Sequence, residues 1–115
     1  MTTMELAPRD DSWLLPVAGQ RITRCCIDGE AVRILCLNMI EISIGEPFTL
    51  QTPDDRKHVL HPGGDAMHLA PVLRILRQVV LEGTAFKDGR LELTFADGSR
   101  IMSKFQLEWI SKPGR

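Results

Sequence analysis

Three histidines come closest in this sequence to the residue types and spacing of a metal site. His58, His61 and His68 are near one another along the chain, and imidazole nitrogens bind Zn²⁺ when they converge at about 2.0–2.1 Å from the ion. Residues three apart on a strand point to opposite faces, so convergence requires a turn, and no cysteine lies nearby to complete a known ligand pattern. The alternatives are a weak metal site and solvated loop histidines, and we expect no cofactor.

Three cysteines are the next candidates for chemistry. Cys25 and Cys26 follow Arg24, and a thiolate becomes reactive beside a basic group, a metal or a helix amino terminus. Adjacent strand residues face opposite ways, however, and free cysteine is a common small core residue, which favours packing over catalysis. With Cys36 the chain has an odd number of cysteines, so the sequence does not indicate a disulfide framework. Reduced thiols in a cytoplasm fit this number better than a disulfide-bonded protein does.

Acidic residues offer a third possibility. Asp54, Asp55 and Asp65 could join His61 in acid–base chemistry, but a loop rich in charge is usually just solvated. We therefore predict no catalytic residue and favour a non-enzymatic protein.

Aromatic side chains are the remaining candidates, because aromatics are enriched in protein interfaces. The interface candidates are Trp13, Phe48, Phe105 and Trp109.

Composition limits the class of protein. A chain of 115 residues fits one domain, and 43% hydrophobic with 25% charged residues argues against disorder and a membrane protein. A net charge of −1 lacks the basic excess that nucleic-acid binding needs. We expect a disordered tail over residues 1–12, one domain over 13–110, a frayed end over 111–115, and neither an export signal nor a membrane span.

The clearest structural pattern is a β-meander over residues 79–102, where Asp88-Gly89 and Asp97-Gly98 separate runs of alternating apolar residues. Bulged turns with Gly89 and Gly98 in the left-handed conformation place the apolar residues on one face. The predicted pairs are Leu93 with Ile101, Ala85 with Leu91, Gly83 with Leu93, and Leu81 with Phe95. The shared parity of Phe105, Leu107 and Trp109 predicts that the third strand continues to about Ile110.

A second meander is predicted in the first half around Asp28-Gly29, with Gly29 as its turn glycine. The same bulged turn would pair Ile22 with Ile34 and Arg24 with Val32. Between the meanders, Leu69, Val72, Leu73 and Leu76 repeat at helical spacing and predict an amphipathic helix. Because Pro71 is tolerated only in a first turn, the helix should start near Leu69.

Together these elements predict an α+β fold. It consists of an antiparallel sheet of two three-stranded β-meanders, with six to seven strands in all and a strong bend, and one amphipathic helix between the meanders packed on the sheet.

Residues 15–22, 46–50 and 84–95, together with Asp97-Gly98, resemble segments of a known family. This is a family of small domains of unknown function from high-GC, actinobacterial-type bacteria, and the resemblance covers about residues 13–110. The family usually ends in an Ala-Trp-Glu-Leu-like tail, from which Leu107-Glu-Trp-Ile110 departs. The resemblance implies the fold and supplies no catalytic residues.

The function we expect is that of a non-enzymatic protein-interaction domain, as a homodimer or bound to another protein, without nucleic acid or membrane as a partner. A toxin-neutralising role is an analogy with other small α+β domains. The alternative is a small metal- or ligand-binding protein or enzyme that uses the His58, His61 and His68 loop.

Overall fold

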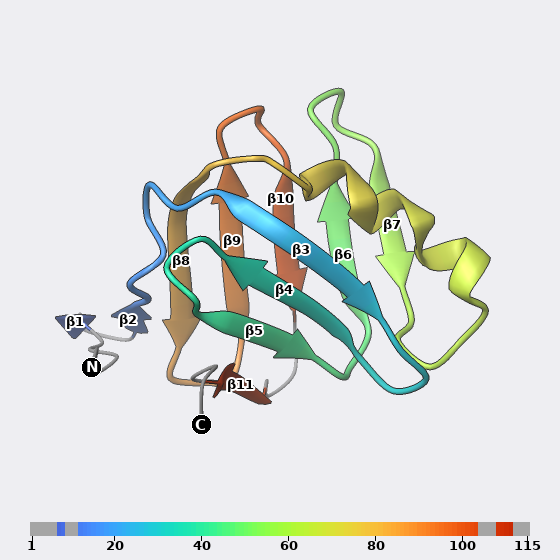
Figure 1. Ribbon diagram of the computed structural model, residues 1–115, viewed down its shortest axis with the longest axis horizontal. Coiled ribbons are helices and arrows are strands. Elements are labelled where there is room, and N and C mark those ends of the chain that lie inside the picture. Colours follow the sequence, from blue (N-terminus) through green and yellow to red (C-terminus); the bar gives the residue numbers. More distant parts are fainter. Residues whose placement is uncertain (1–6, 9–11, 104–107, 112–115) are drawn as a thin grey trace.

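The computed structural model describes residues 7–8, 12–103 and 108–111. These form two antiparallel sheets and one 3-10 helix (Figure 1). The larger sheet has the order β1-β2-β8-β9-β10-β6-β7 and the smaller sheet β11-β5-β4-β3. The strands of the larger sheet are β1 (Ala7–Pro8), β2 (Ser12–Leu14), β8 (Val80–Phe86), β9 (Leu91–Phe95), β10 (Arg100–Ser103), β6 (Phe48–Gln51) and β7 (Lys57–Leu60). Those of the smaller sheet are β11 (Glu108–Ser111), β5 (Glu41–Ile44), β4 (Val32–Cys36) and β3 (Ile22–Ile27), and the helix is η1 (Ala66–Ile75).

The two sheets and η1 share one hydrophobic core. The smaller sheet lies in front of the larger one in Figure 1, and η1 lies beside β3 and contacts β7. Ile34 and Ile42 of the smaller sheet, Leu93 and Phe95 of the larger sheet, and Val72 of η1 are all fully buried in the same cluster. Alternation along each strand therefore directs one apolar face of each sheet toward the other.

The predicted α+β fold of one bent sheet is wrong. The described part of the chain is mostly β, with 48% strand and 11% helix, and its strands form two separate sheets. Gly45 and Pro47 separate β5 from β6, and β6 then pairs with β10 instead of extending the first meander. Such long-range pairing joins β6 and β7 to the second meander.

The prediction that the third strand of the second meander continues to about Ile110 is also wrong. β10 ends at Ser103, and β11, which contains Trp109, pairs with β5 of the smaller sheet. The common parity of the apolar residues extends across both strands, so it does not reveal that the chain changes sheets.

The register of the second meander is confirmed in its central part. Leu93 lies opposite both Ile101 and Gly83, and Ala85 lies opposite Leu91. Gly89 and Gly98 have φ of 96° and 95°, as their bulged turns require. The predicted pair of Leu81 and Phe95 is wrong, because an irregularity between Val80 and Glu82 places Val80 opposite Phe95 and leaves Leu81 58% exposed.

The predicted register of the first meander, with Ile22 opposite Ile34 and Arg24 opposite Val32, is wrong. Ile27 lies opposite Val32 and Cys25 opposite Ile34. The Asp28 carboxylate accepts hydrogen bonds from the amides of Glu30 and Ala31, both at 2.8 Å. This side-chain bonding closes the turn without a left-handed residue at position 29, so Gly29 does not form the bulge expected of it.

The helix is a 3-10 helix that starts earlier than predicted. The Asp65 carboxylate caps it by accepting a hydrogen bond from the Met67 amide at 2.9 Å. Its buried residues, Leu69, Val72 and Ile75, are three apart, which is the repeat of a 3-10 helix. The prediction that Leu73 and Leu76 belong to the buried stripe is therefore wrong.

Candidate functional site

The histidines do not form a ligand set in the described part of the chain. His58 is half-buried on β7 opposite Leu50, His61 is exposed just after β7, and His68 is exposed on η1. Within residues 7–8, 12–103 and 108–111, no group of three His, Cys, Asp or Glu side chains could hold a metal ion. The geometry therefore gives the metal alternative no support.

Two of the three cysteines, Cys25 and Cys36, are poor nucleophiles. Burial raises the pKa of the Cys25 thiol to about 11, and the adjacent Cys26 adds to that shift. Burial also raises the pKa of Cys36 to about 11. Thiols with such pKa values stay protonated near neutral pH, and Cys25 packs against the hydrophobic core. The side chains of Cys25 and Cys36 therefore contribute to core packing.

The aspartates have local structural partners. The Thr52 hydroxyl donates a hydrogen bond to Asp54 and is the main cause that lowers the pKa of this carboxyl group, with a smaller contribution from Arg56 at 3.2 Å. Asp55 accepts a hydrogen bond from the Gln51 side chain, whereas Asp65 caps η1. A carboxyl group with a lowered pKa is ionised near neutral pH and is a poor general acid there.

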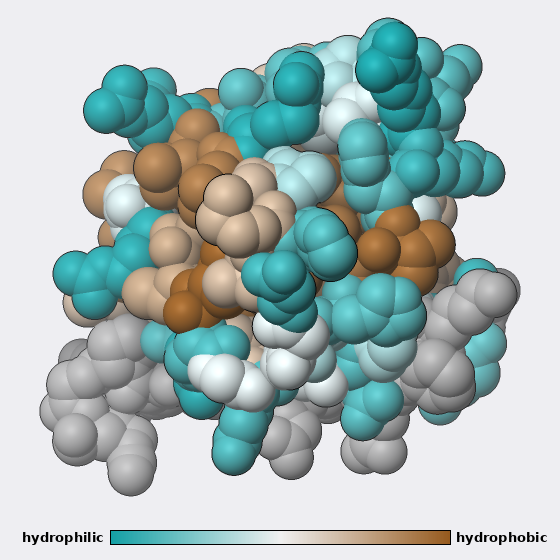
Figure 2. Space-filling view, turned by 90° about the vertical axis from the view of Figure 1, so that its right-hand side faces the viewer, coloured by the Kyte–Doolittle hydropathy of each residue, from teal (hydrophilic) through white to brown (hydrophobic). Residues whose placement is uncertain are grey.

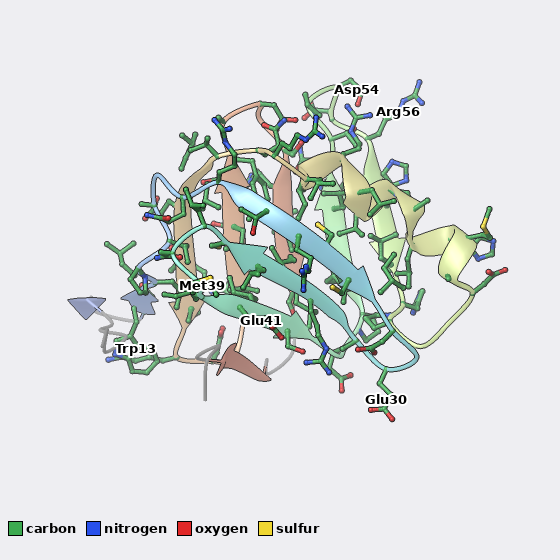
Figure 3. The ribbon with its side chains drawn as sticks, viewed as in Figure 1. Trp13, Glu30, Met39, Glu41, Asp54 and Arg56 are labelled. Atoms are coloured by element: carbon green, nitrogen blue, oxygen red, sulfur yellow. The ribbon has the colours of Figure 1, made fainter. Side chains whose placement is uncertain are left out.

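The two aromatic candidates with described side chains differ in burial. Phe48 is buried in the core, and Trp13 is half-buried on β2 with the Lys87 ammonium 5.6 Å from its ring centroid. In Figure 3, Trp13 is near the opposite end of the molecule from Asp54 and Arg56. Phe105 and the side chain of Trp109 lie outside the described residues.

Sequence reasoning missed a second apolar row on η1. We call this the outer row; it consists of Met67, Ala70 and Leu73 of η1 and of Leu76, the cap residue directly after it. Met67 is 78% exposed, Leu73 47% and Leu76 38%, and the helical repeat of three residues aligns the row along one side of η1. Figure 2 shows apolar atoms gathered on this side of the molecule beside hydrophilic side chains. A period of three over residues 67–76 was the signal that could have revealed it.

Backbone hydrogen bonds fix the end of η1 beside β3. Arg77 has φ of 74°, a left-handed conformation that ends the helical segment. Its amide donates a hydrogen bond to the Ile22 carbonyl at 2.9 Å, and the Ile22 amide donates one to the Gln78 carbonyl at 2.9 Å. With Leu69, Val72 and Ile75 fixed in the core, η1 is anchored along its length and presents the outer row to the outside.

This two-sheet domain belongs to a class of proteins whose activity has not been assigned. Residues 13–107 match a family of unknown function, DUF6188, and the chain belongs to that family. No curated protein and no solved structure matches the chain. Among the helices of the described ranges, none has the length and apolar character needed to cross a membrane.

Proposed function

We propose that this chain is a non-enzymatic protein-interaction domain and that the outer row of η1 is its docking surface. The supporting observation is the exposure of Met67, Ala70, Leu73 and Leu76 on a helix whose other apolar row is already in the core. Contiguous exposed apolar side chains are a feature of protein interaction sites. Bacterial origin, a cytoplasmic location and a toxin as the partner stay predictions.

A photo-cross-linking amino acid at position 70 tests this proposal in the cells that produce the protein. We expect a defined covalent adduct, because a docked partner would cover Ala70. The Leu73→Asp substitution should abolish the adduct, since a carboxylate at this position would have to be desolvated on docking. The mass of the adduct tells a second copy of the chain from another protein.

Val59 provides the matched control position. It is an exposed apolar residue on β7, outside the outer row. The same cross-linker at position 59 should give no such adduct. No adduct from position 70, or equal adducts from both positions, would contradict the proposal.

A further inference from the structure

We infer that the outer row docks an acidic segment of another protein, with carboxylates of that segment paired to Arg24 and Arg77. This inference rests on the proposed function and names the chemistry of the partner. The partner segment would place apolar side chains over Leu73 and Leu76 and acidic side chains along the adjoining edge.

The positions of the two arginines follow from the backbone. The hydrogen bond between the Arg77 amide and the Ile22 carbonyl places Arg77 beside the start of β3, immediately after Leu76 of the outer row. Arg24 lies two residues further along β3, and Arg24 and Arg77 are both exposed residues. Both arginines therefore belong to the part of the chain where the end of η1 meets the start of β3.

The arginines of the described residues divide by location. Those elsewhere pair with carboxylates: Arg33 with Asp28 and Glu41, Arg56 with Asp54, Arg90 with Asp88, and Arg100 with Glu92. The described arginines without such a pair are Arg21, Arg24, Arg74 and Arg77. All four lie in η1, in β3 or within two residues of these elements. The arginines without a carboxylate partner are thus gathered on and beside the two elements that meet at the end of the outer row.

The type of charge specifies the partner. A guanidinium group presents a planar set of donors that matches a carboxylate, and opposite charges at the rim of an interface select the correct partner. A symmetric dimer through this surface would bring the arginines of both copies into one interface. The like charges disfavour that dimer, so a different, acidic chain fits better.

The test is a selection of random peptides displayed on phage against the immobilised full chain, with the Leu73→Asp variant used to remove peptides that bind elsewhere. We expect enriched peptides that combine Asp or Glu with Leu, Ile or Phe. Added salt should weaken binding of the corresponding synthetic peptides, because it screens exposed ion pairs. The Arg24→Gln/Arg77→Gln variant should bind them about three- to tenfold more weakly, as the loss of two partly exposed ion pairs implies.

The matched control is Arg90→Gln, which removes an arginine that pairs with Asp88 in the turn after β8. This variant should bind the peptides with unchanged affinity. Circular dichroism should show that all variants are folded. Enrichment of neutral or basic peptides, or equal binding by the double variant, would overturn this inference and leave the proposed function standing. No peptide that distinguishes the wild type from Leu73→Asp would count against both. Binding of the chain to phosphatidylglycerol vesicles, with loss of that binding in the double variant, would overturn the inference in favour of a membrane.

Discussion

The second meander and η1 are both rich in apolar residues, but they bury them differently. In the meander, Leu91, Leu93, Phe95 and Ile101 alternate with polar residues and are all buried. In η1, apolar residues occupy two of the three rows of a 3-10 helix, and the core covers only one of them. A strand with strict alternation has one apolar face to bury, whereas a 3-10 helix with two apolar rows leaves the other available for a partner.

The largest effect is expected in the meander at Gly83. A Cβ atom at this position would lie 2.7 Å from Val17 Cγ2 and 2.9 Å from Leu93 Cδ2, both of fully buried side chains. Gly83→Val should lower the free energy of unfolding by about 3 kcal/mol, because the packed core cannot make room without strain. Urea unfolding measures this loss, and a change below about 0.5 kcal/mol would show that the segment before β3 is not packed on β8.

The next largest loss of stability is expected from substitution of a turn glycine. Gly98 has φ of 95°, whereas Gly29 is outside the left-handed region and an added Cβ there would meet nothing within 4 Å. Gly98→Ala should therefore destabilise the protein by about 1–2 kcal/mol, and Gly29→Ala should have almost no effect. Equal urea-unfolding midpoints for the two variants would contradict the difference between the two turns.

A smaller loss of stability is expected from removal of the amino-terminal cap of η1. Asp65→Ala removes the acceptor of the Met67 amide and should cost about 1 kcal/mol in the free energy of unfolding. Asp65→Asn keeps an acceptor oxygen at the same place and is the control. If both variants unfold at the wild-type urea concentration, this cap does not stabilise the helix.

A smaller effect is expected from pH. Hydrogen bonds from the Glu30 amide, the Arg33 side chain and the Ala31 amide lower the pKa of Asp28 from 3.8 to about 2. Because the folded state holds the ionised form, the stabilisation is complete above the unfolded pKa and is lost as the pH falls through about 2. Asp28→Asn should remove this part of the pH dependence between about pH 4 and about pH 2, as measured by urea unfolding; an unchanged profile would contradict it.

The local turn chemistry of the second meander could be predicted, because Gly89 and Gly98 supply a conformation that few other residues tolerate. The same dipeptide misled at position 29, where the Asp28 carboxylate closes the turn instead. The pairing of β6 with β10 joins residues far apart in sequence, and no local pattern encodes it.

The candidate site was missed for a different reason. Leu69, Val72, Leu73 and Leu76 fit one face of an α-helix, whereas a repeat of three places Leu69 and Val72 in one row and the other two leucines in the next. The α-helical pattern therefore hid the fact that Leu73 and Leu76 face away from the core. The family resemblance is confirmed as membership of a family of unknown function. The resemblance could not supply the proposed docking surface, since fold and family without an assigned activity do not define a site.

The most direct test of the two-row description of η1 is the change in unfolding free energy caused by Leu73→Ala, compared with Leu69→Ala on the same helix. Leu69 is fully buried, so its truncation should cost about 2–5 kcal/mol. Leu73 is nearly half exposed, so its truncation should cost less than about 1 kcal/mol. Equal losses from the two variants would contradict the account, because Leu73 would then belong to the core and could not serve as a docking residue.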